Sequence, residues 1–138
     1  MCIIAYIPPQ INIDDETIEN MFDNNPETSW YSSQGKFQYI CVFFDQSVSI
    51  YEILITFSGG FSPKEIEIGY SDEDEFENKK PNLVKYETIN LEDSADQQKL
   101  ILKNPIPKCK TIRLLMKKFY DLYGRIIIYD LKVKGNNI

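Results

Sequence analysis

The 138-residue sequence contains no histidine, so it lacks the side chain that most often acts as a general base near neutral pH. This absence excludes Ser-His and Cys-His nucleophile pairs, and with them classical hydrolase chemistry. The sequence offers no other nucleophile with its base and no pair of carboxylates arranged as acid and base. We therefore expect that the protein is not an enzyme.

Cysteine is also scarce, and its spacing is uninformative. Cys2, Cys41 and Cys109 form an odd set without a CxxC motif, so the sequence indicates neither a disulfide framework nor a zinc site. We expect unpaired thiols in a reducing compartment.

Long hydrophobic runs and excess positive charge are missing as well. No stretch approaches the roughly 20 apolar residues that span a bilayer, and the opening MCIIAYIPPQ has no basic region or cleavage site of a signal peptide. The net charge of −6 gives no electrostatic footprint for a phosphate backbone. We expect a cytoplasmic and/or nuclear protein with no membrane insertion and no direct nucleic-acid partner.

What the sequence does contain is a series of short apolar segments, rich in tyrosine and phenylalanine, separated by turn signals. We predict about eight short strands, at 2–7, 39–44, 48–57, 65–70, 83–91, 99–102, 111–116 and 125–134. A switch of apolar parity predicts a bulge near Tyr51 or Glu52. Residues 14–21 have weak helical spacing for about two turns, and the acidic segment 71–82 is typical of a solvated loop. The pattern predicts an all-β fold, an antiparallel β-sandwich or jelly roll, as a single domain over residues 1–138.

A rigid polar loop stands near the start, in NMFDNNPETSW at 20–30. Asx-type side chains and a proline favour a tight turn there, and its oxygen atoms could converge on a hard cation. The phrase FDNNPETSW resembles the FDGxxxTxW loop of the discoidin, or coagulation-factor type C, superfamily of galactose-binding-like domains.

A second resemblance lies in FYDLYGRIIIYDLKVKG at 119–135, together with FSGGFSP at 57–63. These motifs resemble a small group within that superfamily, single-domain proteins associated with the testicular orphan nuclear receptor. The resemblance implies a galactose-binding-like sandwich without enzymatic activity that acts through its end loops. It further implies a protein partner and a role as a transcriptional co-regulator. A weaker likeness, through NPETxW, is to the discoidin-like subunit of the intraflagellar transport complex.

A cation site is the first candidate site. Asp23, Asn25 and Thr28 lie in the opening loop, and the resemblance implies that Asp130 completes the site from the last strand. Two carboxylates and several carbonyls would suit Ca²⁺ better than Mg²⁺. The alternative is a metal-free Asx-turn in which Asp23 accepts backbone N–H bonds and Asp130 is solvated.

A ligand cleft at the loop end is the second candidate, with an aromatic platform and polar groups that would suit a sugar. Its predicted lining is Trp30, Tyr31, Gln34, Phe61, Tyr120, Tyr123 and Arg125. The alternatives are that Trp30 is buried beneath its loop and that Arg125 ties two loops together by bonding backbone carbonyls.

The third candidate is an exposed protein-binding surface, because the segment FYDLY places several apolar side chains in a predicted loop. Its residues are Phe61, Tyr120, Leu122 and Tyr123. In the alternative, Phe119, Leu122 and Tyr123 plug the sandwich end. Two functions follow: an intracellular adaptor that binds a protein, which we favour, and a lectin-like module that binds a glycan.

Overall fold

The computed structural model describes residues 3–6, 20–32, 34–72 and 84–137. Their elements are all strands: β1 (Ile3–Tyr6), β2 (Trp30–Tyr31), β3 (Gln38–Phe57), β4 (Glu65–Ser71), β5 (Val84–Asn90), β6 (Gln98–Met116) and β7 (Ile127–Asn137). The all-β prediction is therefore confirmed. The predicted helix at 14–21 and the predicted loop at 71–82 lie almost wholly outside the described residues.

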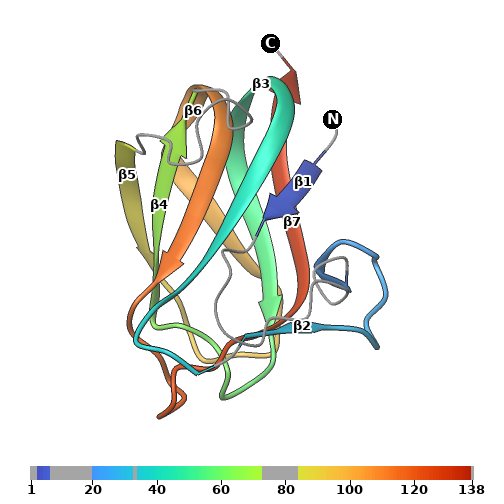
Figure 1. The fold of residues 1–138 in the computed structure, drawn as a ribbon, viewed down its shortest axis with the longest axis vertical. Coiled ribbons are helices and arrows are strands. Elements are labelled where there is room, and N and C mark those ends of the chain that lie inside the picture. The colour runs from blue at the N-terminus through green and yellow to red at the C-terminus, as the bar shows by residue number, and fades with distance from the viewer. Residues whose placement is uncertain (1–2, 7–19, 33, 73–83, 138) are drawn as a thin grey trace.

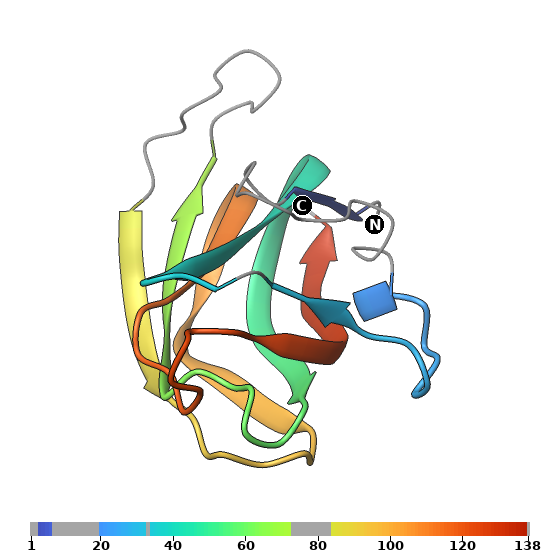
Figure 2. The ribbon, with the colours of Figure 1, turned by 60° about the horizontal axis from the view of Figure 1, so that its bottom comes forward.

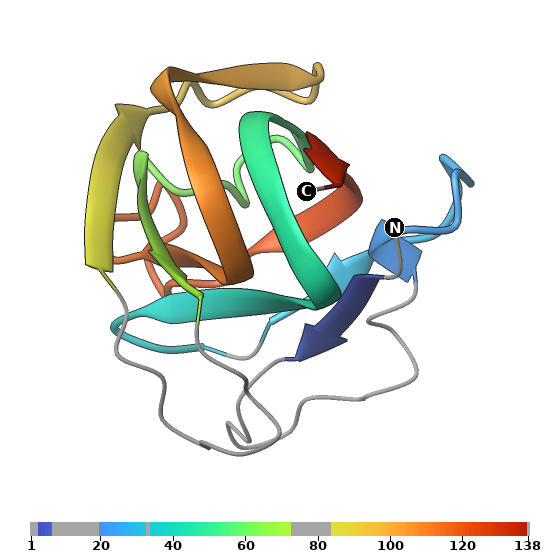
Figure 3. The same cartoon turned by 90° about the horizontal axis from the view of Figure 1, so that it is seen from above.

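One antiparallel sheet runs in the order β2-β7-β3-β6-β4-β5, with β1 paired to β3. It folds over on itself because β3 and β6 each belong to two layers. In one layer the start of β3 pairs with β1 and with the end of β6, which also pairs with β4. In the other layer the rest of β3 pairs with β7 and with the start of β6. Figures 1 and 3 show the two layers facing each other, which is the predicted sandwich.

The prediction of about eight short strands was wrong in its lengths. The segments 39–44 and 48–57 are one strand of 20 residues, β3, and the segments 99–102 and 111–116 are one strand of 19 residues, β6. Register shifts between Phe43 and Val48, between Val48 and Ile50, and between Ile50 and Glu52 let β3 bend from one layer to the other without ending. The last shift confirms the bulge predicted near Tyr51 or Glu52.

Side chains from both layers meet in one hydrophobic core. Ile66 and Ile68 of β4 are fully buried, as the alternation of that segment predicts. Ile40, Val42 and Phe44 of β3 are buried as well. The packing of these faces fixes the strands that carry the loops described next.

The loops that leave the sandwich at the bottom of Figure 1 are joined by backbone hydrogen bonds, and Figure 2 brings this loop end forward. The amide of Lys64 donates to the carbonyl of Lys118 at 2.7 Å, and that of Tyr120 donates to the carbonyl of Ser62 at 3.2 Å. The amide of Gly35 donates to the carbonyl of Tyr123 at 3.1 Å. Three loops, at 32–37, 58–64 and 117–126, therefore form one connected surface.

No helix in the described part of the chain is long and apolar enough to cross a bilayer.

Candidate functional site

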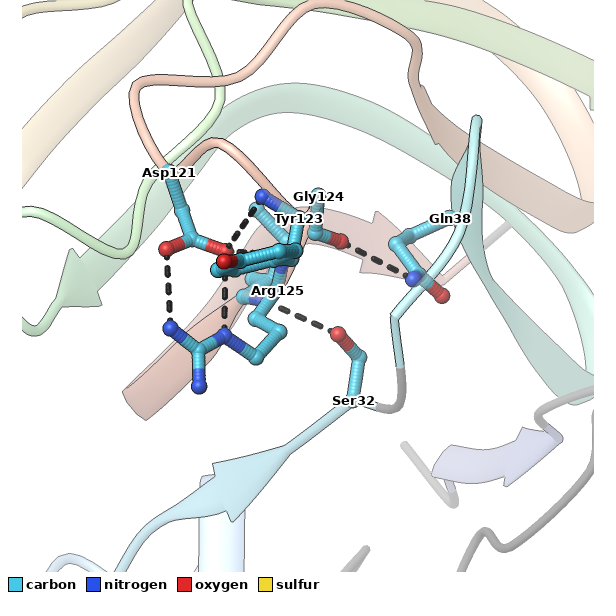
Figure 4. Close-up of polar contacts among 7 residues, drawn as sticks. Ser32, Gln38, Asp121, Tyr123, Gly124 and Arg125 are labelled. Carbon is cyan, nitrogen blue, oxygen red and sulfur yellow. Dashed lines mark hydrogen bonds and ion pairs between the residues drawn. The ribbon is translucent and has the colours of Figure 1, made fainter.

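The 117–126 loop is fixed by an ion pair that the sequence analysis missed. Arg125 donates from Nε to Asp121 Oδ2 at 3.0 Å and from Nη2 to Oδ1 at 3.1 Å (Figure 4). The guanidinium and the carboxylate therefore form a bidentate ion pair. The amides of Tyr123 and Arg125 also donate to Asp121 Oδ2, at 3.1 and 3.0 Å. The carboxylate therefore organises the loop around itself.

These contacts explain the acidity of Asp121. Its hydrogen bonds, above all from the Arg125 side chain, lower the pKa of the carboxyl from 3.8 to about 2, although burial acts in the opposite direction. The same partner raises the pKa of Arg125 above its ordinary value. Both groups are thus charged at neutral pH and neutralise each other.

Arg125 also contacts two aromatic rings. Its guanidinium carbon lies 5.3 Å from the ring centroid of Phe61, in the 58–64 loop, and 5.3 Å from that of Tyr123. Both distances are in the range of cation–π contacts. Arg125 does connect two loops, as the alternative proposed. It does so by contacting the ring of Phe61 in the 58–64 loop and the carboxylate of Asp121 in the 117–126 loop, and not by bonding backbone carbonyls.

Gly124 holds the neighbouring 32–37 loop against this loop. Its φ of +70° is in the left-handed region, and a Cβ at this position would lie 2.0 Å from the carbonyl oxygen of Gly35. The Gly124 carbonyl accepts a bond of 3.0 Å from Gln38 Nε2, and the Ser32 hydroxyl accepts one of 2.9 Å from the Ile126 amide. Figure 4 shows both bonds beside the Asp121–Arg125 pair.

A hollow of about 690 Å³ lies between these loops. It is lined by Gln34, Gly35, Lys36, Lys64, Phe119, Tyr120, Asp121, Leu122, Tyr123 and Gly124. The Tyr120 hydroxyl donates to the Leu91 carbonyl at 3.1 Å, and Lys64 Nζ lies 5.6 Å from the Tyr120 ring centroid. The hollow is therefore shaped by fixed aromatic groups and two lysines.

The structure places the residues of the predicted cleft in different positions. Gln34, Tyr120 and Tyr123 line the hollow, and Arg125 contacts the rings of both Tyr123 and Phe61. Two others lie on β2, which pairs with β7. Tyr31 is half exposed and does not line the hollow. Trp30 does not line a cleft: it is 1% exposed and belongs to the hydrophobic core, because packing a large ring inside removes more apolar surface from water than a loop platform would.

The predicted protein-binding surface contains the two most exposed apolar side chains of the loop end, Leu122 and Tyr123. Leu122 is 95% exposed, Tyr123 58% and Tyr120 39%, whereas Phe61 is half-buried. Of the three side chains in the plugging alternative, only Phe119 packs against the core. Leu122 therefore stands exposed on a loop that hydrogen bonds hold in place, and no described residue covers it.

The 23–28 loop is an Asx-turn. Asp23 accepts a bond of 2.9 Å from the Asn25 amide and one of 2.5 Å from the Thr28 hydroxyl, and these lower the pKa of its carboxyl, the Thr28 bond most. Asn25 Oδ1 accepts a bond from the Glu27 amide at 3.0 Å. The left-handed φ of Asn24, 56°, suits an asparagine in such a turn.

Asp130 adjoins this turn. Asn24, Asn25, Pro26 and Asp130 line a hollow of about 370 Å³, although Asp23 does not. Asp130 forms an ion pair with Lys132 at 3.5 Å. In the described residues no cluster of three or more His, Cys, Asp or Glu side chains could hold a metal ion. The proximity of the turn and Asp130 fits the calcium prediction, while the hydrogen bonds of Asp23 fit the metal-free alternative, so calcium binding stays a prediction.

The two described cysteines, Cys41 and Cys109, are buried and are not joined in a disulfide. Burial raises the pKa of Cys109 to about 12. A thiol with so high a pKa is not a nucleophile at neutral pH. Cys2 lies outside the described residues.

No protein-family model matches the sequence. The curated proteins that it resembles carry one name. The chain is 33% identical over 115 residues to the nuclear receptor 2C2-associated protein of Danio rerio, covering 83% of this chain and 77% of that protein. The chain belongs to the nuclear receptor 2C2-associated protein family. The Homo sapiens member is 30% identical over 122 residues, which cover 87% of this chain and 81% of that protein.

Solved structures show the same fold at low sequence identity. A chitosan-binding module of a Paenibacillus sp. IK-5 chitosanase/glucanase superposes with a TM-score of 0.75 at 17% identity, over 96% of this chain and 94% of that one. A family 32 carbohydrate-binding module of C. perfringens NanJ, solved with galactose, gives 0.72 at 16% identity over 95% and 92%. An F5/8 type C domain from Bacteroides fragilis gives 0.73 at 15% over 99% and 93%. The predicted discoidin-type, galactose-binding-like fold and the resemblance to the receptor-associated group are therefore confirmed.

Proposed function

We propose that this chain is a non-catalytic protein-binding module, a single galactose-binding-like domain over residues 1–138, that binds its partner with the loop end. The observation that carries the proposal is the position of Leu122, which is 95% exposed at the tip of the 117–126 loop. The Asp121–Arg125 pair and the close approach of Gly124 to Gly35 fix that loop, so the backbone holds Leu122 in one exposed position.

The energetics favour a partner that covers this tip. Full burial of a leucine side chain contributes about 1.5–3 kcal/mol, and a preorganised loop loses little conformational entropy on binding. Tyr120 and Tyr123 flank Leu122 and are partly exposed, and tyrosine is enriched at protein interfaces. Tyrosine is also one of the residues most enriched among binding hot spots, which favours Tyr120 and Tyr123 as contact residues around Leu122.

Family membership supports a protein partner. The relatives are described as associated with a nuclear receptor, and a chain that does likewise would act in the cytoplasm or nucleus as a transcriptional co-regulator. No histidine is present in the sequence and Cys109 is buried, so the candidate site has no obvious group for catalysis.

A second candidate function is glycan binding. The hollow of about 690 Å³ lies at the loop end, with Tyr120 and Tyr123 as aromatic walls and Gln34 as a polar group. Structures of the same fold include a module solved with galactose and a chitosan-binding module. A neutral sugar, however, would not cover Leu122, which projects with 95% of its surface exposed.

Affinity capture from native lysate separates the two functions. The wild-type chain, Leu122→Ser and the control Ile101→Ser are compared, because Ile101 is a second exposed apolar residue, on β6 and outside the loop-end hollow. Each capture is repeated with competing monosaccharides and with a calcium chelator. We expect defined proteins that are retained by wild type and Ile101→Ser, lost with Leu122→Ser, and insensitive to sugar.

Elution by galactose or another monosaccharide would favour the lectin-like function. Equal capture by wild type and Leu122→Ser would reject the loop tip as the protein-binding site. Both substitutions are at exposed positions, so each should change the free energy of unfolding by no more than about 0.5 kcal/mol.

A further inference from the structure

The surface at the loop end continues into a second hollow. This hollow, of about 450 Å³, is lined by Lys36, Phe37, Tyr39, Arg113, Leu115 and Lys117. Lys36 lines the 690 Å³ hollow as well, so the two hollows adjoin. We call the joined surface the basic groove.

The second hollow lies on the side of the sandwich. Tyr39 of β3 pairs with Leu115 of β6, and their neighbours Ile40 and Leu114 are fully buried in the core. Because side chains alternate between the two faces of a strand, Tyr39 and Leu115 point outward. The basic groove therefore turns from the end of the sandwich onto its outer face.

Positive charge dominates the basic groove. It is lined by four cations, Lys36, Lys64, Arg113 and Lys117. Its single carboxylate, that of Asp121, is held by Arg125. Lys117 is paired with Glu67 at 3.2 Å, but in the described residues no ion pair joins Lys36, Lys64 or Arg113 to a carboxylate. This local excess of cations stands on a chain whose net charge is −6.

Apolar side chains are interspersed among these cations. Phe37, which is 47% exposed, lines the second hollow together with Lys36. The exposed side chains of Leu122 and Tyr123 line the first hollow, to which Lys36 also belongs. We propose that the basic groove binds an extended peptide segment whose groove-facing side chains include both acidic and bulky apolar ones. This inference rests on the proposed protein-binding function and specifies the chemistry of the partner.

The shape and charge of the groove favour a peptide over other ligands. A neutral sugar would offer no charge to the three cations that pair with no carboxylate in the described part of the chain, whereas carboxylates of a peptide would pair with them. A bilayer would touch the projecting Leu122 but could not follow the surface from the loop end onto the outer face of β3 and β6. An extended chain can follow this turn and place every second side chain, acidic or apolar, in the two hollows.

Fluorescence anisotropy with three labelled peptides tests the inference. In the first, every second residue is in turn Glu, Leu or Phe, so that these side chains share one face, and the residues between them are uncharged. The second peptide replaces each Glu with Lys, and the third replaces Leu and Phe with Ser. We expect the wild-type chain to bind the first at least about tenfold more tightly than the others. A Lys36→Glu, Lys64→Glu double variant should lose about tenfold for the Glu peptide and gain affinity for the Lys peptide.

Lys103→Glu is the matched control, because Lys103 is exposed on β6 outside both hollows. It should bind all three peptides as wild type does. Equal affinity for the Glu and Lys peptides, or no effect of the double variant, would overturn the inference. So would binding to phosphatidylserine vesicles without binding to the Glu peptide. If the peptides fail while Leu122→Ser still abolishes protein capture, the proposed function stands and only the acidic-peptide chemistry is rejected.

Discussion

Asp121 and Arg125 form a two-bond ion pair within a single turn, with nitrogen–oxygen distances of 3.0 and 3.1 Å. The pair fixes the backbone that carries Leu122 and, by cancelling its own charges, leaves the lysines of the basic groove to set the local potential. It also places the guanidinium against the rings of Phe61 and Tyr123. One contact thus supports both the shape and the charge of the loop end.

The Asp121 carboxyl should titrate with a midpoint of about 2, below its ordinary 3.8. A pKa that is lower in the folded state means that the contribution of this pair to stability is present above pH 3.8. It is lost as the pH falls through about 2. The ¹³C shift of the Asp121 side-chain carbonyl, followed by NMR against pH, measures this midpoint.

Arg125→Gln provides the comparison for that titration. It removes the guanidinium, whose side-chain hydrogen bonds do most to lower the pKa of Asp121, so the midpoint should return toward 3.8. Amide exchange of Tyr123 should also become faster, on the order of tenfold, because the acceptor of its N–H is no longer held in place. A wild-type midpoint near 3.8 would contradict the ion pair.

Gly124→Ala should destabilise the loop end. Its φ of +70° is strained for alanine, and the new Cβ would lie 2.0 Å from the Gly35 carbonyl oxygen. We expect a loss of at least about 2 kcal/mol in the free energy of unfolding, measured with urea.

Gly60→Ala separates backbone strain from the clash. Gly60 has a φ of +82°, yet a Cβ added at this position would meet no atom within 4 Å, so only the strain of about 1–2 kcal/mol applies. Peptide or protein binding should weaken with Gly124→Ala more than with Gly60→Ala. Equal losses in stability for both variants would argue against close contact between the 32–37 and 117–126 loops.

Trp30 should behave as a core residue. It is the single tryptophan of the chain and is 1% exposed, so its emission should be blue-shifted and resistant to acrylamide quenching. Trp30→Ala should cost about 3–5 kcal/mol of stability. Trp30→Phe should cost less, because it keeps most of the ring volume and removes an indole N–H that has no partner in the described residues. Strong quenching by acrylamide would show that Trp30 is exposed to solvent and would contradict its place in the core.

A calcium site at the 23–28 loop requires that Tm rise with the logarithm of calcium concentration. Asp130→Asn should abolish the rise, whereas Glu27→Gln, an exposed change in the same loop, should keep it. Differential scanning calorimetry with calcium and with a chelator measures both. Identical Tm values in calcium and chelator would establish the metal-free Asx-turn in place of the calcium site.

Much of the fold is readable in local patterns. The period of two in 65–70 predicts the buried face of β4, and Ile66 and Ile68 are indeed fully buried. The parity switch near Tyr51 predicts the bulge that lets β3 bend. Strand lengths are less predictable, since the polar residues at 45–47 read as a turn but lie within β3. Phe43 and Val48, which precede and follow this stretch, both pair with β6, and this pairing outweighs the local preference.

The candidate site depended on information that no single segment contains. The sequence indicated that FYDLY and the NNPETSW loop are binding elements, but it could not separate Phe119, which packs on the core, from Leu122, which is exposed. It also missed Asp121, whose role depends on the return of the chain at Arg125.

The sequence by itself determined the all-β class, the alternating buried faces and the absence of a histidine base, because these follow from local periodicity and composition. The tertiary structure alone decided which aromatic side chains face the core and which cations line the basic groove. The physical reason is that burial and local charge depend on residues brought together from distant segments, such as Lys36, Lys64 and Arg113.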